Sequence, residues 1–206
     1  QQYPLQPQQK TTFLVLNLKS EVLQYSITMK SVMKEPLINL INEQIYYETD
    51  TWSNGAIAAG EDLAIRSVKV RGLLEEDVGT SVSNRIIYND LKRFTSFINR
   101  EYQKNVCDFY ASTDSVFQFL LYDAKMKGHY DYHTDHMKEN PRILTMLVGL
   151  NSVNDYDGGE LFVQNNEKGV KLDKGDVVVF PSNFMYPHKV SPVTRGERRV
   201  LIIWTQ

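Results

Sequence analysis

Two stretches in the first half of the chain carry apolar residues at helical spacing. Residues 36–46 open with a proline, which suits the first turn of a helix, and continue with leucines and isoleucines three or four positions apart. Residues 83–102 carry a longer stripe of the same kind, made of Ile86, Ile87, Leu91, Phe94, Ile98 and Tyr102. We expect both segments to be helices and the stripe to pack against a sheet.

The second half of the chain is dominated by short runs of β-branched, aromatic and other apolar residues, which are typical of strands. We expect strands at residues 116–122, 130–135, 143–150, 160–163, 176–180, 186–190 and 198–204. Similar runs nearer the N-terminus predict further strands at 13–18, 22–27 and 65–74. Helices followed by a run of strands indicate an α+β fold in which the helices support one sheet.

Length and local composition predict a single domain in residues 11–206. A chain of 206 residues is long enough to bury one substantial core. Residues 1–10 are rich in glutamine and proline and are expected to be a flexible leader. Glycines and other small residues in 51–60 favour a mobile loop that Trp52 anchors, the alternative being a structural loop in which Trp52 simply packs on the core.

Charge and cysteine content narrow the classes of partner. The formal net charge of −2 and the isoelectric point near 6.1 provide no global attraction for nucleic acid. Cys107 is the single cysteine, so no intrachain disulfide can form, and no apolar run approaches the length that crosses a bilayer. We therefore expect a cytoplasmic protein with no nucleic acid and no membrane as partner.

His133 and Asp135 are two positions apart on a predicted strand. Side chains at this spacing project to the same face of a strand, so both can reach one metal ion. His188, from a distant predicted strand, would complete a set of two histidines and one carboxylate, which holds Fe(II) on one side and leaves positions open for small molecules. Asp131 lies on the same face and is an alternative oxygen ligand.

Arg198 directly precedes the apolar residues 200–203 on the last predicted strand. A guanidinium in a buried strand needs an anionic partner to offset its desolvation, and arginine engages carboxylates through paired hydrogen bonds. Its neighbour Arg199 points to the opposite face and is expected to be solvated. The pattern predicts a carboxylate-bearing ligand near the metal, whereas a zinc hydrolase would leave Arg198 unexplained.

Taken in order along the chain, these motifs resemble those of the Fe(II)- and 2-oxoglutarate-dependent dioxygenases, and in particular the prolyl 4-hydroxylase-like family. The resemblance rests on YDAKMKGHYDYHTD at 122–135, RILTMLVGLN at 142–151, YDGGELF at 156–162, KGDVVVFP at 174–181 and HKVSPVTRGERRVLIIW at 188–204. Weaker similarity reaches back through Asn105 and Gln118 to IRS at 65–67. It implies a double-stranded β-helix, or jelly-roll, core supported by N-terminal helices.

The resemblance also implies roles for individual residues. His133, Asp135 and His188 are the expected catalytic metal ligands, and Arg198 is the expected catalytic partner of the distal carboxylate of 2-oxoglutarate. Tyr122 and Thr145 hold positions from which hydroxyls contact this co-substrate in the family. For Thr145, a strand residue whose hydroxyl is satisfied locally is an equally simple interpretation.

Three further positions are expected to lie near the substrate, namely Arg142, Tyr130 and Trp204, and the resemblance implies that the region 51–60 borders the substrate groove. Tyr130 is three positions before His133, so the two side chains would point to opposite faces unless the strand is irregular. Gly149 stands where the family often has a larger polar or aromatic residue. One side-chain contact to the co-substrate is therefore missing, so we expect a wider pocket or a water in its place.

The implied reaction consumes O2 and 2-oxoglutarate, releases succinate and CO2, and hydroxylates a C–H bond at Fe(II), with ascorbate expected to support activity. The preferred substrate by analogy is a prolyl residue in a peptide or protein. One alternative is an oxygenase of the same scaffold that acts on another amino-acid side chain, a small molecule or an alkylated base. A second alternative is a non-catalytic metal-binding interaction domain.

Overall fold

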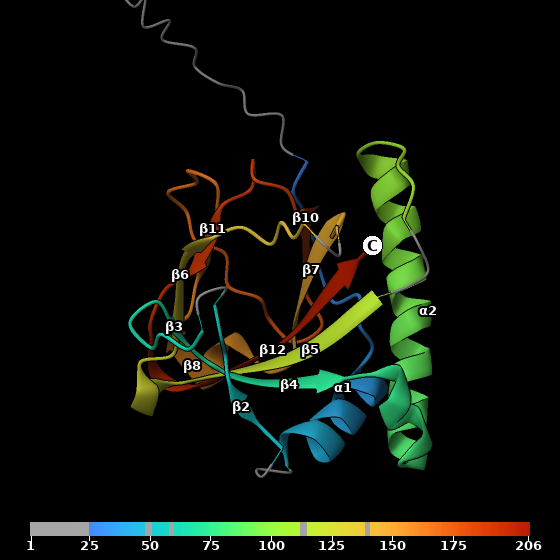
Figure 1. The fold of residues 1–206 in the computed structure, drawn as a ribbon, viewed down its shortest axis with the longest axis horizontal. Helices are drawn as coiled ribbons and strands as arrows, with labels where there is room; N and C mark the ends of the chain where they lie inside the picture. The colour runs from blue at the N-terminus through green and yellow to red at the C-terminus, as the bar shows by residue number, and fades with distance from the viewer. Residues whose placement is uncertain (1–24, 48–50, 58–59, 112–114, 139–140) are drawn as a thin grey trace, which may run out of the picture.

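The computed structural model describes residues 25–47, 51–57, 60–111, 115–138 and 141–206 (Figure 1). The leader expected at residues 1–10 and the strand expected at 13–18 lie outside these ranges. Within them, no helix combines the length and the hydropathy that a membrane span needs.

The two predicted helices are present and slightly longer than expected. Helix α1 (Glu35–Ile41) has a proline at its first turn and continues into a π-helical turn, η1 (Asn42–Tyr46). Helix α2 (Val82–Asn105) follows the 3-10 turn η2 (Glu75–Gly79), and the Ser81 hydroxyl caps it by accepting a hydrogen bond from the Asn84 backbone N–H. Most of the apolar stripe of α2 is buried against the sheet, but Ile86 is exposed.

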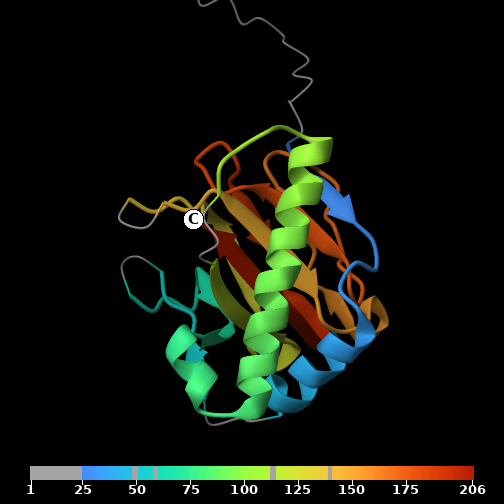
Figure 2. The same cartoon turned by 90° about the vertical axis from the view of Figure 1, so that its right-hand side faces the viewer.

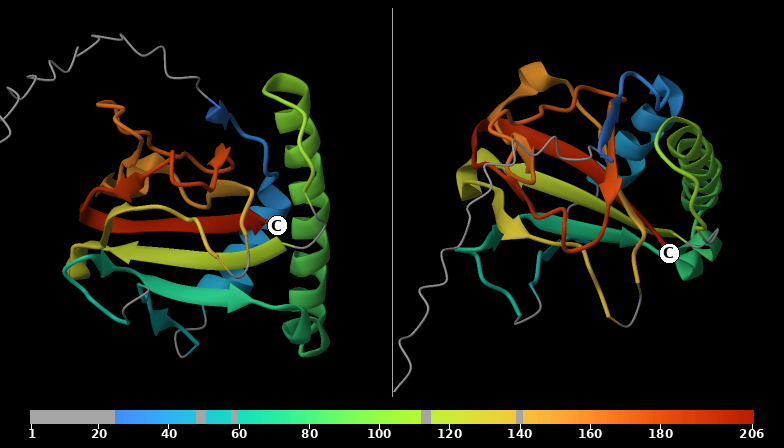
Figure 3. Two further views of the ribbon diagram at one scale, coloured as in Figure 1. Left: turned by 45° about the horizontal axis from the view of Figure 1, so that its top comes forward. Right: turned by 90° about the horizontal axis from the view of Figure 1, so that it is seen from above.

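The larger sheet is antiparallel and has eight strands. Seven of them follow one another across it as β1 (Ile27–Met29), β10 (Val177–Pro181), β7 (Leu144–Gly149), β12 (Val193–Thr205), β5 (Ser115–Asp123), β4 (Lys69–Leu73) and β2 (Ser53–Asn54). The eighth, β8 (Tyr156–Gly158), pairs with the first part of β12. Figure 3 shows β12, β5 and β4 side by side in this sheet.

The smaller sheet has four antiparallel strands in the order β3 (Arg66–Ser67), β6 (His129–His133), β11 (His188–Val190) and β9 (Leu161–Val163). One apolar cluster fills the space between the two sheets, and it includes Leu147, Val190 and Ile202. A second cluster joins the outer face of the larger sheet to α1 and α2, which cover that face (Figure 2). This arrangement confirms the predicted α+β fold with a double-stranded β-helix core and supporting helices.

Several boundaries differ from the prediction because pairing, not local pattern, sets them. The strand expected at 65–74 is two strands in different sheets, β3 and β4, with buried Val68 between them. The strand expected at 130–135 ends at His133, so Asp135 lies just beyond regular structure. Strand β12 begins at Val193 instead of residue 198, because its first residues pair with β8, a strand too short to predict.

Candidate metal centre and its pocket

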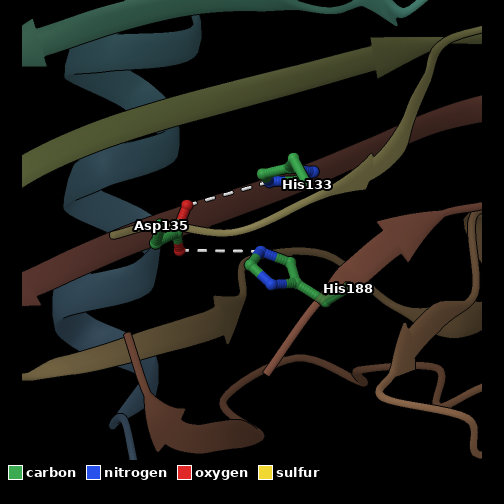
Figure 4. Close-up of side chains that lie close together, drawn as sticks. All are labelled: His133, Asp135 and His188. Carbon is green, nitrogen blue, oxygen red and sulfur yellow. Dashed lines mark ion pairs between the residues drawn. The ribbon is translucent and has the colours of Figure 1, made fainter. Parts of the chain in front are cut away.

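The pairing of β11 with β6 places His188 directly opposite His133. Asp135 follows β6 and turns back toward both rings (Figure 4). Its two carboxylate oxygens lie 3.8 Å from His133 Nε2 and 3.5 Å from His188 Nε2, and the ligand atoms of all three residues lie within 4.8 Å of one another. This spacing fits one small cation held by two imidazoles and a carboxylate.

The alternative ligand Asp131 is not part of this group. Its carboxylate is exposed and accepts a hydrogen bond from the Tyr132 backbone N–H. The other two histidines also lie apart: His129 contacts the backbone carbonyls of Lys127 and Ala64, and His136 is exposed at the pocket rim. Among the described residues, the triad is the one cluster with ligands close enough to share a metal ion.

Both histidines of the triad are oriented by the protein backbone. Nδ1 of His133 lies 2.8 Å from the Asp131 carbonyl, and Nδ1 of His188 lies 3.0 Å from the Tyr186 carbonyl. Because a carbonyl can only accept, each Nδ1 carries the proton and each Nε2 presents its lone pair toward Asp135. Burial, with the nearby His188, lowers the pKa of His133 to about 4, so this ring is neutral near pH 7.

Asp135 is buried and held by side chains from two neighbouring strands. Its Oδ2 accepts hydrogen bonds from the Thr145 hydroxyl at 2.7 Å and from the Trp204 indole N–H at 3.0 Å. Thr145 and Trp204 are direct cross-strand partners, and the Thr145 hydroxyl also contacts the Ser182 hydroxyl at 2.7 Å. Burial acts to raise the pKa of Asp135, but His188, the Trp204 donor and His133 outweigh it and lower the pKa. The carboxylate is thus ionised and fixed.

Tyr130 and His133 lie on the same side of β6 because the strand is irregular. His188 pairs with His133 and Val190 pairs with Tyr130, so three steps along β6 oppose two along β11. Such a bulge breaks the alternation of faces. The two rings stack with their centroids 3.4 Å apart and an interplanar angle of 15°. This is the strand irregularity that Tyr130 needs in order to lie on the same face as His133.

Arg198 is buried to 1% exposure and lies directly opposite Tyr122 on β5. Its guanidinium carbon is 5.1 Å from the centre of the Tyr122 ring. Within the described part of the chain, none of its three guanidinium nitrogens has a hydrogen-bond partner. A buried cation without a counter-ion is strongly unfavourable, so the site fits a ligand that brings a carboxylate. Burial raises the pKa of Tyr122, which keeps its hydroxyl protonated and able to donate.

The triad opens into a pocket of about 350 Å³. Tyr122, Tyr130, Arg142 and Trp204 all line it, whereas Arg198 lies against Tyr122 outside the lining. The lining also includes Ala56 and Ile57 from the segment 51–60, and Arg66 and Gln118 from the weaker part of the family resemblance. The sequence had assigned no individual role to these four residues, which the fold brings to the pocket from separate strands and a loop.

Different residues of the segment 51–60 pack on the core and line the pocket. Trp52 is half-buried and packs beside Tyr46, with ring centroids 5.0 Å apart, so it belongs to the core. Ala56 and Ile57 line the pocket instead. Residues 58–59 lie outside the described part.

Two expectations about neighbouring residues are wrong. Gly149 does not widen the pocket, because a Cβ there would lie 2.3 Å from the Asp173 carbonyl, so backbone already fills that space. Arg199 is half-buried, not solvated: it donates to the Asn42 side chain at 3.3 Å and pairs with Glu197 at 3.2 Å.

Comparisons with known proteins agree with this geometry. Residues 117–206 match the 2OG-Fe(II) oxygenase superfamily. The chain is 25% identical over 185 residues to a PKHD-type hydroxylase of Prochlorococcus marinus (strain MIT 9515), which covers 87% of this chain and 77% of that protein. It is 29% identical over 169 residues to a PKHD-type hydroxylase of Pseudomonas putida (strain W619), which covers 77% of this chain and 69% of that protein.

Two solved structures have a similar fold. One is a prolyl hydroxylase from Trichoplax adhaerens in complex with a hypoxia inducible factor peptide, with a TM-score of 0.70, 20% identity and coverage of 87% of this chain and 82% of that chain. The other is a Pseudomonas putida prolyl-4-hydroxylase, with a TM-score of 0.65, 18% identity and coverage of 88% and 92%.

The fold and the triad together define an oxygenase that uses a metal held by two histidines and one carboxylate on a double-stranded β-helix. Residues 117–206, which match the 2OG-Fe(II) oxygenase superfamily, include all three triad members and Arg198. Fe(II) and 2-oxoglutarate are the metal and co-substrate that this match and the triad imply.

Proposed function

We propose that this oxygenase hydroxylates a prolyl residue in a peptide or protein, consuming O2 and 2-oxoglutarate and releasing succinate and CO2. The observation that carries the co-substrate assignment is the unpartnered guanidinium of Arg198, which is buried beside Tyr122, a residue that lines the pocket of the triad. The PKHD-type hydroxylase relatives support a hydroxylation reaction, and the fold shared with prolyl hydroxylases supports a prolyl substrate.

In this proposal the triad holds Fe(II), which supplies the oxygen-activating chemistry when bound. His133 and His188 present Nε2 lone pairs, and Asp135 supplies the negative charge. Arg198 and the Tyr122 hydroxyl anchor the distal carboxylate of 2-oxoglutarate, because they are the buried cation and buried donor nearest each other on β12 and β5.

We assign Thr145 a positioning role in place of the expected contact with the co-substrate. Its hydroxyl is already engaged by Asp135 and Ser182, so it acts by holding the carboxylate in place. Trp204 acts on Asp135 in the same way through its indole N–H. Ser182 had no assigned role from sequence, because it follows β10 and reaches the site only through the sheet.

The substrate ring is proposed to enter the part of the pocket bordered by Tyr130, Arg142 and Trp204. Tyr130 presents the edge of a ring fixed by its stack on His133. The Arg142 guanidinium lies flat over the Trp204 ring at 3.6 Å. These contacts make a rigid wall beside the metal, as positioning of an unactivated C–H bond requires. A cytoplasmic location and stimulation by ascorbate remain predictions.

The test is incubation of the purified protein with Fe(II), ascorbate, 2-oxoglutarate and a panel of proline-containing peptides, each matched to a peptide with alanine at the same position. We expect succinate release and a gain of one oxygen on proline, located by fragment mass spectrometry. Oxygen gained on a different residue would support the alternative of another side-chain hydroxylase. Turnover with none of the peptides would leave the prolyl assignment without support.

A further inference from the structure

Two arginines, Arg66 and Arg142, line the pocket that holds the triad. Among the described residues that line it, Asp135 is the single carboxylate. The pocket therefore carries more positive than negative charge before any ligand enters, and this imbalance has no part in the roles assigned above.

Arg66 is held in place by a ring and by backbone, not by an acid. Strand pairing sets it opposite Tyr130, and its guanidinium carbon lies 4.6 Å from the centre of that ring. Its Nη1 donates to the Ala56 carbonyl at 2.5 Å. Its Nε is buried without a hydrogen-bond partner in the described part of the chain, and a Cβ on Gly55 would lie 2.6 Å from it. The cation is therefore held in place, and among the described residues no carboxylate forms an ion pair with it.

Arg142 is held in a similar way on the Trp204 ring. Its Nη1 lies 3.5 Å from the Asp135 carbonyl and 3.9 Å from Asp135 Oδ1, which are long contacts. Burial lowers the pKa of Arg142, Asp135 acts to raise it, and the charge on Arg66 lowers it further. The two guanidiniums thus repel one another across the pocket.

Asp135 cannot neutralise both arginines. Its oxygens already face His133, His188, Thr145 and Trp204, and a divalent cation in the triad would offset its charge. Like charges held close in a partly desolvated pocket create a potential that attracts anions. Each guanidinium lies over an aromatic ring, and guanidinium groups engage carboxylates through paired hydrogen bonds.

We propose that Arg66 and Arg142 form a subsite for a carboxylate of the substrate, next to the position that is hydroxylated. This inference rests on the proposed function, since it concerns the same pocket. The carboxylate comes from an acidic side chain adjacent to the target residue or from a free C-terminus beside it. The distal carboxylate of 2-oxoglutarate is bound separately, at Arg198.

The experiment measures peptide binding without turnover. The full chain is loaded with Mn(II) and 2-oxoglutarate without oxygen, and fluorescence anisotropy follows labelled peptides that differ in one charge. One pair has Glu or Gln beside an internal proline, and another ends just after the proline as an acid or an amide. In at least one of the two pairs, we expect the charged peptide to bind about tenfold more tightly than its neutral partner. This difference corresponds to one charge-assisted hydrogen bond. The pair with the larger difference identifies the source of the carboxylate.

Substitutions at Arg66 test whether this residue causes the preference for charged peptides. Arg66→Gln should remove most of the charge preference, and Arg66→Lys should keep part of it. Arg93→Gln on α2 is the matched control, because that side chain is 79% exposed on the helix that covers the outer face of the larger sheet. Higher salt should shrink the preference of the wild-type protein, a measurement that needs no variant.

Equal binding of charged and neutral peptides by the wild-type protein overturns the subsite, as does full preference in a folded Arg66→Gln variant. Mass spectrometry of the same peptides under turnover separates this failure from failure of the prolyl assignment. If the two peptides of a pair bind equally and are hydroxylated equally, the subsite is contradicted and the prolyl assignment is not. If the charged peptide binds more tightly but gains no oxygen on proline, the subsite is supported and the prolyl assignment is contradicted.

Discussion

The indole N–H of Trp204 donates a hydrogen bond to Oδ2 of Asp135 across 3.0 Å, linking the last strand of the larger sheet to the carboxylate of the triad. Thr145, the cross-strand partner of Trp204, donates to the same oxygen. Two donors from two strands therefore set the direction in which the carboxylate faces His133 and His188.

Replacing Trp204 with Phe should weaken metal binding about 10- to 100-fold, since the ring is kept while the donor to Asp135 is lost. Titration of the metal-free protein with Mn(II), followed by isothermal calorimetry, measures the effect. Trp52→Phe is the matched control, because Trp52 packs beside Tyr46 outside the pocket. Unchanged Mn(II) affinity in Trp204→Phe would show that Thr145 alone orients the carboxylate.

Arg198→Met should abolish binding of 2-oxoglutarate and leave the ligand-free fold as stable as before or more stable. The physical reason is that the wild-type protein buries a guanidinium with no hydrogen-bond partner among the described residues, and a thioether side chain takes its place at lower desolvation cost. Thermal unfolding with and without 2-oxoglutarate reports both effects, because a ligand that binds the folded state raises its Tm. A stable variant whose Tm still rises with 2-oxoglutarate would contradict the assignment of Arg198.

The metal-free protein should lose stability as the pH falls from about 6.5 toward 4. The pKa of His133 is lowered from 6.5 to about 4 in the folded protein, so between these values the unfolded chain binds more protons than the folded one. The free energy of unfolding therefore rises with pH across that window. Urea unfolding at a series of pH values tests this, and His133→Gln should flatten the curve.

Gly149→Ala should destabilise the fold by roughly 1–3 kcal/mol, because the added Cβ would lie 2.3 Å from the Asp173 carbonyl and 2.9 Å from that of Leu172. Gly72→Ala is the matched control, since its Cβ meets nothing within 4 Å. Both are measured by urea unfolding. Similar stability of the two variants would mean that the segment beside Gly149 can move aside.

The sequence predicted those features that depend on a local pattern within one helix or strand. The apolar stripe of 83–102 marked α2, the apolar runs marked the strands that follow residue 115, and the spacing of His133 and Asp135 marked two ligands for one metal. Burial of Arg198 also followed locally, from the apolar residues after it. These inferences succeed because periodicity and burial are properties of neighbours in the chain.

Contacts between residues that are far apart in the chain became visible only in the three-dimensional structure. The bulge between β6 and β11 stacks Tyr130 on His133, the pairing of β7 with β12 turns Thr145 and Trp204 onto Asp135, and the split of 65–74 into two sheets brings Arg66 over Tyr130. No local pattern encodes these contacts, because register between strands is selected by the packing of the whole barrel. The same packing fills the space beside Gly149 with backbone, and it leaves the Arg198 guanidinium without a hydrogen-bond partner among the described residues.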